Sequence, residues 1–382
     1  MSLRNSSFLL SLLLVLLSAA HSQAQAQGQA QAQVNPSPSP TPKPDDQERV
    51  RVFTEEVRLA VAATDAGGHY DALEVDDVMV LEDGEQQQIR SVQHLPANVL
   101  LLVDVGNQLG LKDTNTTKAV AMRVVTSLAE GNRIAVMQFA TRPELLQSWT
   151  TDKTAIAKVL KSKLISGKTS RLPDALAAAA QLFQDTPAGT RHLVLITDGV
   201  SEPGGKITTV KALRELNSAQ VNVHVLSYTL LARLALSGRN KIVKGGDGVQ
   251  RDANPATNPV ANGDPTLPPG TTRTPGFKLG SIDTDVAMRR KRKEYERATV
   301  ESEKQLVALA EESGGRILLP DSTESLLSQA ESISRDIGSQ YVVTYRPTRP
   351  LALAKPGEYR KVEVASRRVG LHLRSRQGYV VP

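Results

Sequence analysis

Short, continuous runs of apolar residues recur along the middle of the chain and predict buried strands. Strands covered on both faces in a parallel sheet carry such runs, whereas half-exposed strands alternate apolar and polar residues. The five runs are Val99–Val103, Ile134–Phe139, Leu193–Ile196, Val221–Leu226 and Ile317–Leu319.

Segments with a helical spacing of apolar residues lie between these runs. Apolar side chains repeat there at i, i+3, i+4 or i+7, which places them on one face of a helix. The sets are Ala121, Val124, Val125 and Leu128; Ile156, Val159 and Leu160; Leu172, Leu176, Ala179, Ala180 and Phe183; and Leu326, Ala330, Ile333 and Ile337. This alternation predicts a doubly wound α/β domain over residues 97–339, with a mostly parallel central sheet and helices on both faces.

The two ends of the folded part carry shorter, strand-like patterns. Val57–Thr64 and Val78–Val92 are typical of half-buried antiparallel strands, and Gly84 marks a hairpin turn that needs positive φ. Because residues 47–96 and 340–382 are each too short to bury a core alone, we expect them to pair into one small β-module.

The first 24 residues have the pattern of a secretory signal peptide. Arg4 precedes an apolar run, Phe8–Leu17, and small residues follow it. That run is about half of the ~20 residues that a membrane-spanning helix needs. We therefore expect an exported protein, periplasmic or extracellular. Residues 25–46 alternate Gln with Ala and then place proline at every second position, which predicts a disordered, extended linker.

A long stretch with little apolar periodicity interrupts the α/β pattern at 237–282. It is rich in Pro, Gly, Asn and Thr, and it predicts a flexible insert. A helix of about Asp285–Ser313 follows and opens with the basic run Arg289–Lys293. Because positive charge near a helix N-terminus opposes the macrodipole, the run favours a solvated helix. Docking to an acidic surface is the alternative.

Composition removes several function classes. Cysteine is absent, which excludes thiol nucleophiles, Cys-ligated zinc, iron–sulfur clusters and disulfides. The net charge is +6, and residues 341–382 hold nine basic and two acidic residues, so the positive charge is concentrated in the tail. The basic run lacks interleaved aromatic residues, so we expect no nucleic-acid partner. Salt-dependent contact with acidic envelope surfaces is the partner that these charges suggest.

Three polar loops form the candidate site. In a parallel α/β sheet, ligands bind beyond the carboxyl ends of the strands. Asp104 directly follows the first apolar run, Thr169 precedes the predicted helix Arg171–Phe183, and Asp198 follows the run that ends at Ile196. Metalloprotease, nucleophile-elbow and phosphate-loop motifs are absent from the sequence.

The motifs that carry these loops resemble the von Willebrand factor type A domain in order and spacing, over roughly Ala97–Ile337. They are Val99–Gln108, Gly131–Phe139, Gly167–Thr169 with Asp174–Leu176, and Leu195–Gly199. Further segments are similar to an exported bacterial group, the acidobacterial VWFA-related proteins. These include Leu81–Gly84, Leu309–Arg316, Gln340–Tyr345, Tyr359–Val364 and Arg376–Tyr379.

The resemblance implies a metal-ion-dependent adhesion site. In that family one loop supplies Asp-x-Ser-x-Ser, a second supplies Thr and a third supplies Asp, and they hold Mg²⁺ or Mn²⁺ with one position left for an acidic residue of a protein partner. The ligands implied here are Asp104, Gln108, Thr169 and Asp198. Gly106 and Gln108 stand where the two serines are expected. The site is therefore degenerate, since Gly106 offers no side-chain oxygen and Gln108 holds its oxygen farther out than a hydroxyl.

The leading hypothesis is an exported, non-catalytic interaction module of adhesion-like type, with metal-dependent and metal-independent binding both open. One alternative is a cell-envelope scaffold held by basic surfaces. The other is a hydrolase that uses Asp104 and Asp198 as a carboxylate pair. Because the sequence offers no oriented nucleophile and no cofactor motif, we predict no enzyme and assign no catalytic residue.

Overall fold

The computed structural model describes residues 55–107, 109, 113–184, 186, 189–240 and 286–381, of which 238–240 are described by their backbone alone. The predicted signal peptide 1–24, the linker 25–46 and insert residues 241–282 lie outside the described residues. So does Gln108, one of the four implied metal ligands. No helix among the described residues has the length and apolar character to cross a bilayer.

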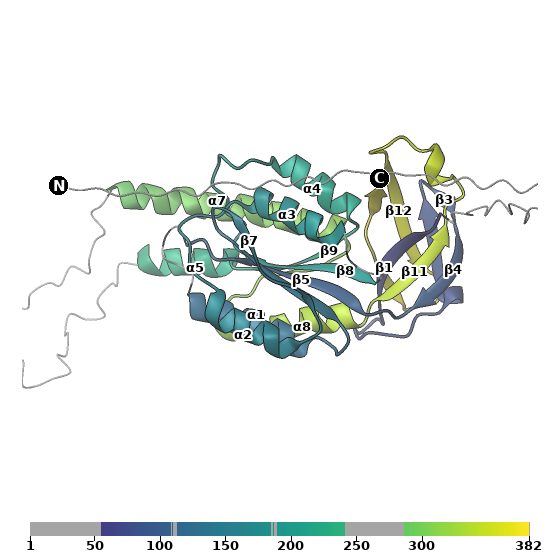
Figure 1. Cartoon of the computed structure of the whole chain (residues 1–382), viewed down its shortest axis with the longest axis horizontal. Helices are drawn as coiled ribbons and strands as arrows, with labels where there is room; N and C mark the ends of the chain where they lie inside the picture. The colour runs from purple at the N-terminus through teal and green to yellow at the C-terminus, as the bar shows by residue number, and fades with distance from the viewer. Residues whose placement is uncertain are drawn as a thin grey trace, which may run out of the picture. The chain divides into compact units, whose positions relative to one another are not determined.

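A six-stranded sheet forms the centre of the α/β domain (Figure 1). Its order is β10-β9-β8-β5-β6-β7, and every neighbouring pair is parallel except β6 and β7. The strands are β5 (Ala97–Asp104), β6 (Arg133–Phe139), β7 (Pro143–Thr150), β8 (Thr190–Thr197), β9 (Asn222–Ser227) and β10 (Ile317–Leu318). All eight residues of β5 are buried, as its continuous apolar run predicts.

Helices cover both faces of this sheet (Figure 1). On one face α1 (Thr114–Ser127), α2 (Lys153–Lys163) and α8 (Thr323–Gly338) pack against side chains such as Leu101 and Val103. On the other face α3 (Leu172–Gln184), α4 (Thr209–Ser218) and α7 (Val286–Glu312) pack against Leu100 and Leu102. Successive residues of β5 thus point to opposite cores, and the predicted fold class is confirmed.

One helix extends into a segment where a loop was expected. α5 spans Thr229–Asn240, so its last turn lies inside the range 237–282 that the composition assigned to a flexible insert. This corrects the start of the insert. Ala232 and Leu236 are buried against Tyr295 of α7. A helix of this length is marginal by itself, so these contacts stabilise α5.

The two chain ends meet in a β-module of two four-stranded sheets. One has the order β13-β1-β11-β4 and the other β14-β12-β2-β3. From the N-terminal part come β1 (Val57–Thr64), a 3-10 turn (Val75–Asp77), β2 (Val78–Glu82), β3 (Glu85–Gln86) and β4 (Gln88–Gln93). From the C-terminal part come β11 (Tyr341–Arg346), a 3-10 turn (Leu351–Leu353), β12 (Tyr359–Ser366), β13 (His372–Arg374) and β14 (Gly378–Val380). Asp83 and Gly84 both have positive φ, so the β2–β3 turn has the predicted hairpin geometry.

N-terminal and C-terminal strands pair in both sheets, alternate in the first of them, and share one apolar core. β1 pairs antiparallel with β11, which pairs with β4, and β2 pairs with β12. Val61, Val80 and Val343 lie in the core between the sheets. Neither end of the chain could bury these side chains without the other.

Asp336 of α8 fastens the β-module to the α/β domain. Its carboxylate is 1% exposed and accepts hydrogen bonds from the Tyr70 hydroxyl (3.0 Å) and the Arg374 guanidinium of β13. Its other oxygen lies 3.4 Å from Nδ1 of His224. His192 Nδ1 and His224 Nε2 are 3.0 Å apart, and burial holds the pKa of both histidines well below the ordinary value. A neutral histidine pair therefore lies beside the contact between α8 and the β-module.

Candidate functional site

The sheet brings the three predicted loops to one edge. β5 and β8 are parallel neighbours, so Asp104 at the end of β5 and Asp198 directly after β8 lie at the same carboxyl edge. A parallel bridge between Gly106 and Gly167 holds the loop of Thr169 against the loop of Asp104. Asp104 and Asp198 are 1% and 2% exposed, whereas Thr169 is partly exposed. The structure therefore places Asp104, Thr169 and Asp198 in neighbouring loops.

Hydroxyl and amide groups of the chain hold the Asp104 carboxylate. Oδ1 accepts hydrogen bonds from the Ser170 hydroxyl and from the Gly106 N–H at 3.0 Å. Oδ2 accepts one from the Thr197 hydroxyl at 2.6 Å. Thr197 in turn accepts a bond from the Gly199 N–H at 2.9 Å. Both Asp104 oxygens therefore have donors from within the domain.

Asp198 is held in the same way by a donor from a distant helix. Its Oδ1 accepts the Val200 N–H at 3.1 Å, and its Oδ2 accepts the hydroxyl of Tyr295 on α7. Ser302, two turns further along α7, donates to the Asp198 carbonyl at 3.1 Å. Burial and the adjacent Asp198 carboxylate raise the pKa of Tyr295 far above that of a free tyrosine, so the phenol stays a hydrogen-bond donor at neutral pH.

Gly106 has no room for the serine that the resembled motif carries. A Cβ at this position would overlap the Ser170 hydroxyl and would lie 2.8 Å from the Thr169 carbonyl carbon and 2.9 Å from the Ser170 amide nitrogen. The Ser170 hydroxyl thus lies where the side chain of residue 106 would begin. Because that hydroxyl is bonded to Asp104, the second loop supplies a hydroxyl group that the first loop lacks.

These residues offer a divalent ion a poor set of ligands in the arrangement seen. Mg²⁺ needs six oxygens in near-octahedral geometry. The four carboxylate oxygens of Asp104 and Asp198 each accept a hydrogen bond from the chain itself. Gly106 can supply no side-chain ligand. Within the described parts of the chain, no group of three or more His, Asp or Glu side chains is placed to hold a metal ion.

Three residues that complete the site were not among the sequence candidates: Ser170, Thr197 and Tyr295. Ser170 and Thr197 each adjoin a predicted site residue, so a search for hydroxyls next to the candidates finds them. Tyr295 lies almost a hundred positions after Asp198 on α7. No local signal marks it.

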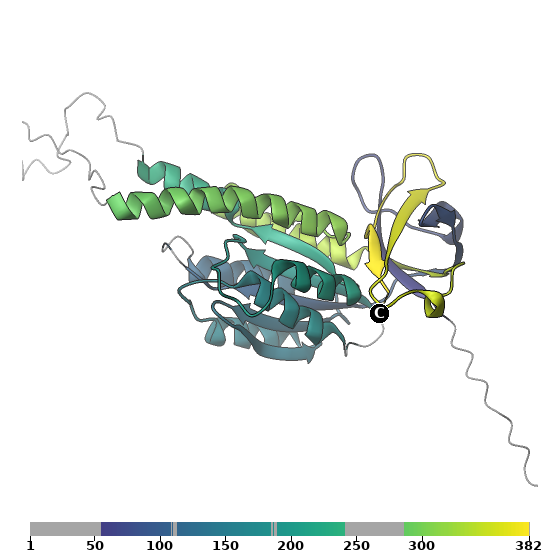
Figure 2. The same ribbon diagram turned by 90° about the horizontal axis from the view of Figure 1, so that it is seen from above.

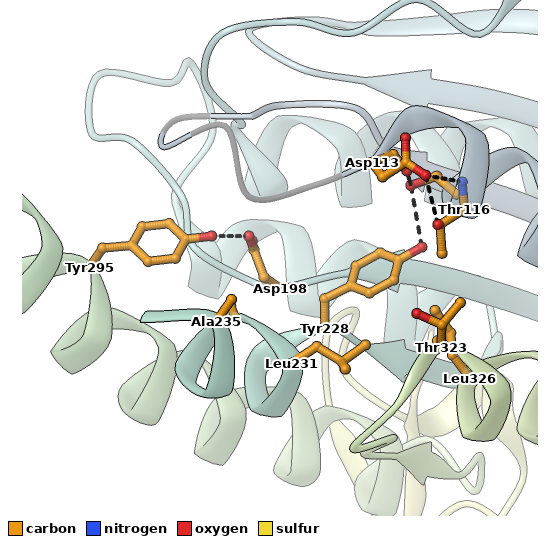
Figure 3. A pocket seen from close by; sticks show the side chains of 11 residues that line it. Asp113, Thr116, Asp198, Tyr228, Leu231, Ala235, Tyr295, Thr323 and Leu326 are labelled. Carbon is orange, nitrogen blue, oxygen red and sulfur yellow. Dashed lines mark hydrogen bonds between the residues drawn. The ribbon is translucent and has the colours of Figure 1, made fainter. Parts of the chain in front are cut away.

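A cavity of ≈ 220 Å³ adjoins Asp198 and Tyr295 (Figure 3). α1, α5, α7 and the start of α8 enclose it. Its polar lining comes from Asp113, Thr116, Thr117, Asp198, Tyr228, Tyr295 and Thr323, and its apolar lining from Leu231, Ala232, Ala235 and Leu326. Asp113 caps α1 through the N–H groups of Asn115 and Thr116, and the hydrogen bond from the Thr116 hydroxyl, together with these N–H bonds, lowers the pKa of its carboxyl group. The cavity therefore offers an apolar wall from α5 and hydroxyl and carboxylate groups opposite it.

Solved structures are similar to parts of this chain at low identity. A von Willebrand factor type A protein from Catenulispora acidiphila is 10% identical, covers 86% of this chain and 75% of its own, and has a TM-score of 0.41. An aerotolerance-related membrane protein from Bacteroides fragilis is 17% identical, with 63% and 98% covered and a TM-score of 0.38. The vWF domain of the type V pili tip protein Mfa5 from Porphyromonas gingivalis is 21% identical, with 31% and 43% covered and a TM-score of 0.27.

At these identities and TM-scores the likeness carries no argument about function. No curated protein matches the chain. The comparisons do not support the narrower resemblance to the acidobacterial VWFA-related proteins. The family model of the von Willebrand factor type A domain matches residues 98–244, which hold Asp104, Thr169 and Asp198. Residues 98–244 of the α/β domain are therefore identified with the von Willebrand factor type A domain.

Proposed function

We propose that this chain is an exported, non-catalytic protein-interaction module that binds its partner at the carboxyl edge of the six-stranded sheet, without a divalent ion. A von Willebrand factor type A domain is generally an interaction module, and the candidate loops lie at the edge where α/β sheets bind ligands. The signal-like first 24 residues support export.

The observation that carries metal independence is the set of internal hydrogen bonds around the two carboxylates. Ser170 and Thr197 donate to Asp104, and Tyr295 donates to Asp198. A divalent ion would have to compete with these donors for the carboxylate oxygens and find other ligands in place of the missing Gly106 side chain. Binding without an ion also means that the partner need not supply the acidic residue that completes a metal shell.

The cavity beside Asp198 is the place where a partner side chain would enter. Its ≈ 220 Å³ is below the ~300–1,000 Å³ of pockets that hold small-molecule ligands. That size suits a single side chain of a protein better than a free metabolite. Interfaces commonly anchor through one such side chain in a desolvated pocket.

The hydrolase alternative is disfavoured by the same geometry. A general acid or base must come within ~3 Å of the substrate proton that it moves. Asp104 and Asp198 are 1% and 2% exposed, and protein donors occupy their oxygens. Both carboxylates support the structure of the loops in this proposal.

The first test is calorimetric titration of Mg²⁺ and of Mn²⁺ into residues 25–382, with Asp198→Ala as the control. We expect no saturable heat up to about 10 mM metal. A site with a Kd above that concentration would be largely empty at the millimolar metal levels found outside cells. Saturable heat that disappears in Asp198→Ala would refute metal independence and leave the interaction function standing.

The second test addresses the binding surface. Ala235→Trp places a large side chain into the α5 wall of the cavity, whereas Leu234→Trp alters a neighbouring exposed position that does not line it. In affinity capture from an envelope extract, we expect a partner retained by the wild-type chain and by Leu234→Trp to be lost with Ala235→Trp. Addition of EDTA should leave capture unchanged. Equal capture by both variants would contradict the proposed surface.

A further inference from the structure

A line of positive charge runs along the outward face of α7, the helix that closes the candidate site. α7 packs through Tyr295, Thr299, Ser302, Leu306, Leu309 and Ala310, which are spaced by three or four residues and form one buried stripe. α7 and α5 run side by side and extend past the other helices of the α/β domain (Figure 2). The face of α7 opposite the buried stripe is exposed over most of its length.

Four exposed cations occupy that opposite face: Arg289, Lys293, Arg297 and Lys304. We call them the α7 basic stripe. Their spacings of four, four and seven residues keep them on one side of a helix with 3.6 residues per turn. At 1.5 Å per residue the stripe is about 22 Å long, and its first three cations are about 6 Å apart.

The acidic residues on α7 do not cancel this stripe. Glu294 pairs with Arg290 at 3.0 Å, and Glu303 pairs with Arg233 of α5 at 2.8 Å. Glu296 and Glu301 flank the stripe, and the exposed Glu311 lies on its face seven residues after Lys304, but no ion pair joins any of them to it among the described residues. The stripe therefore presents net positive charge to its surroundings.

The folded chain gains no stability from this arrangement. Cations in the first turns of a helix lie near the positive end of its macrodipole, which disfavours them. Arg289 and Lys293 lie in the first two turns of α7 and have no acidic partner among the described residues. An anionic partner outside the chain would offset the unfavourable interaction with the macrodipole and would supply the negative charge that these two cations lack.

Two exposed valines identify the kind of anionic partner. Val286 is 68% exposed and Val300 is 45% exposed. Helical geometry places both on the face of the basic stripe, Val300 between Arg297 and Lys304 and Val286 about one turn before Arg289. Apolar side chains between cations suit a lipid headgroup layer, where the cations meet phosphate and the apolar groups enter the acyl boundary. An acidic polymer in water would use only the cations.

We propose that the α7 basic stripe binds the surface of an anionic lipid membrane. The stripe faces away from the cavity beside Asp198, so this proposal does not depend on the proposed protein-binding function. It predicts peripheral attachment that salt weakens, since charges at a membrane surface are screened beyond about 10 Å at 0.1 M salt.

The test is co-sedimentation with lipid vesicles of residues 25–382, which omit the apolar run that could bind lipid by itself. The vesicles are phosphatidylcholine alone or with about one third phosphatidylglycerol. One variant carries Arg289→Gln, Lys293→Gln and Arg297→Gln. The matched control carries Lys158→Gln, Lys161→Gln and Lys163→Gln, which removes three exposed cations from α2.

We expect binding to the anionic vesicles only, with loss of binding near 0.5 M salt. Each cation close to an anionic leaflet contributes about a five-fold gain in binding, so the α7 variant should bind on the order of a hundred-fold more weakly. The α2 control should bind nearly as well as the wild-type chain. Equal weakening by both variants, or equal binding to neutral vesicles, would overturn the proposal.

Val286→Ser with Val300→Ser separates a membrane from a polymer. We expect this pair to weaken vesicle binding several-fold and to leave binding to polyglutamate unchanged. Unweakened vesicle binding by the valine variant, together with polyglutamate binding as tight as vesicle binding, would mean that the stripe recognises acidic polymers. That result would refute the membrane proposal.

Discussion

Restoring the first serine of the adhesion motif should destabilise this protein. The informative change is Gly106→Ala, which adds only the Cβ that any serine there would also carry. That atom would overlap the Ser170 hydroxyl and approach two backbone atoms of the Thr169–Ser170 peptide at 2.8 and 2.9 Å. Backbone atoms cannot rotate away, so the loops themselves must separate.

Two effects set the expected magnitude. Overpacking of a buried site typically costs about 1–3 kcal/mol. If the Ser170 side chain turns away to make room, its hydrogen bond to the buried Asp104 carboxylate is lost, and bonds to charged groups are worth about 1.5–3 kcal/mol. We therefore expect Gly106→Ala to reduce the free energy of unfolding by about 3–5 kcal/mol.

Urea denaturation followed by circular dichroism measures this loss as a lower midpoint at unchanged m-value. Gly338→Ala is the matched control, because nothing lies within 4 Å of a Cβ there and its φ needs no glycine. That control should be neutral or up to about 1 kcal/mol more stable.

A double-mutant cycle with Ser170→Gly identifies the cause. Ser170→Gly removes the overlapping hydroxyl but leaves both backbone contacts, so Gly106→Ala should cost about 1–3 kcal/mol less in that background. The reasoning is refuted if Gly106→Ala costs less than about 1 kcal/mol, or if its cost is the same with and without the Ser170 side chain.

Three further predictions concern buried polar groups. Tyr295→Phe leaves an oxygen of the buried Asp198 without its phenol donor and should cost about 1.5–3 kcal/mol of unfolding free energy; unchanged stability in urea would contradict the bond. Arg374→Gln removes the cation that pairs with the buried Asp336 carboxylate between α8 and the β-module, and it should cost about 2–4 kcal/mol of unfolding free energy. An unchanged midpoint in urea would contradict this. Burial lowers the pKa of His192 and His224 well below 6.5, so only the unfolded chain takes up these protons as the pH falls. The free energy of unfolding should therefore be at its full value above pH 6.5 and should decline below that pH by up to ~1.4 kcal/mol per pH unit for each histidine. Equal free energies of unfolding at pH 7 and pH 5.5, measured by urea denaturation, would contradict this.

Local patterns were sufficient for the class of fold and the place of the site. A run such as Val99–Val103 is apolar at every position because both faces of β5 are buried, and that requirement is visible without the structure. The turn at Asp83 and Gly84 is likewise local, since it needs positive φ. Asp104 and Asp198 could be placed at one edge because parallel strands end on the same side of a sheet.

Other features depend on which distant side chains meet. α5 packs against Tyr295, which lies beyond the stretch that was expected to be an insert. The resembled motif indicates which oxygens are missing at Gly106 but not that Ser170 supplies one beside it. Neither hydrophobic period nor motif spacing encodes such contacts, because they arise only when packing brings together loops that are far apart in the chain.

The sequence by itself therefore determined the layered α/β architecture and the identity of the candidate carboxylates, because both follow from short-range periodicity and strand direction. The tertiary structure alone decided the state of those carboxylates. Ser170, Thr197 and Tyr295 reach Asp104 and Asp198 from three different elements, and the packing of α7 on the sheet brings the last of these donors into place.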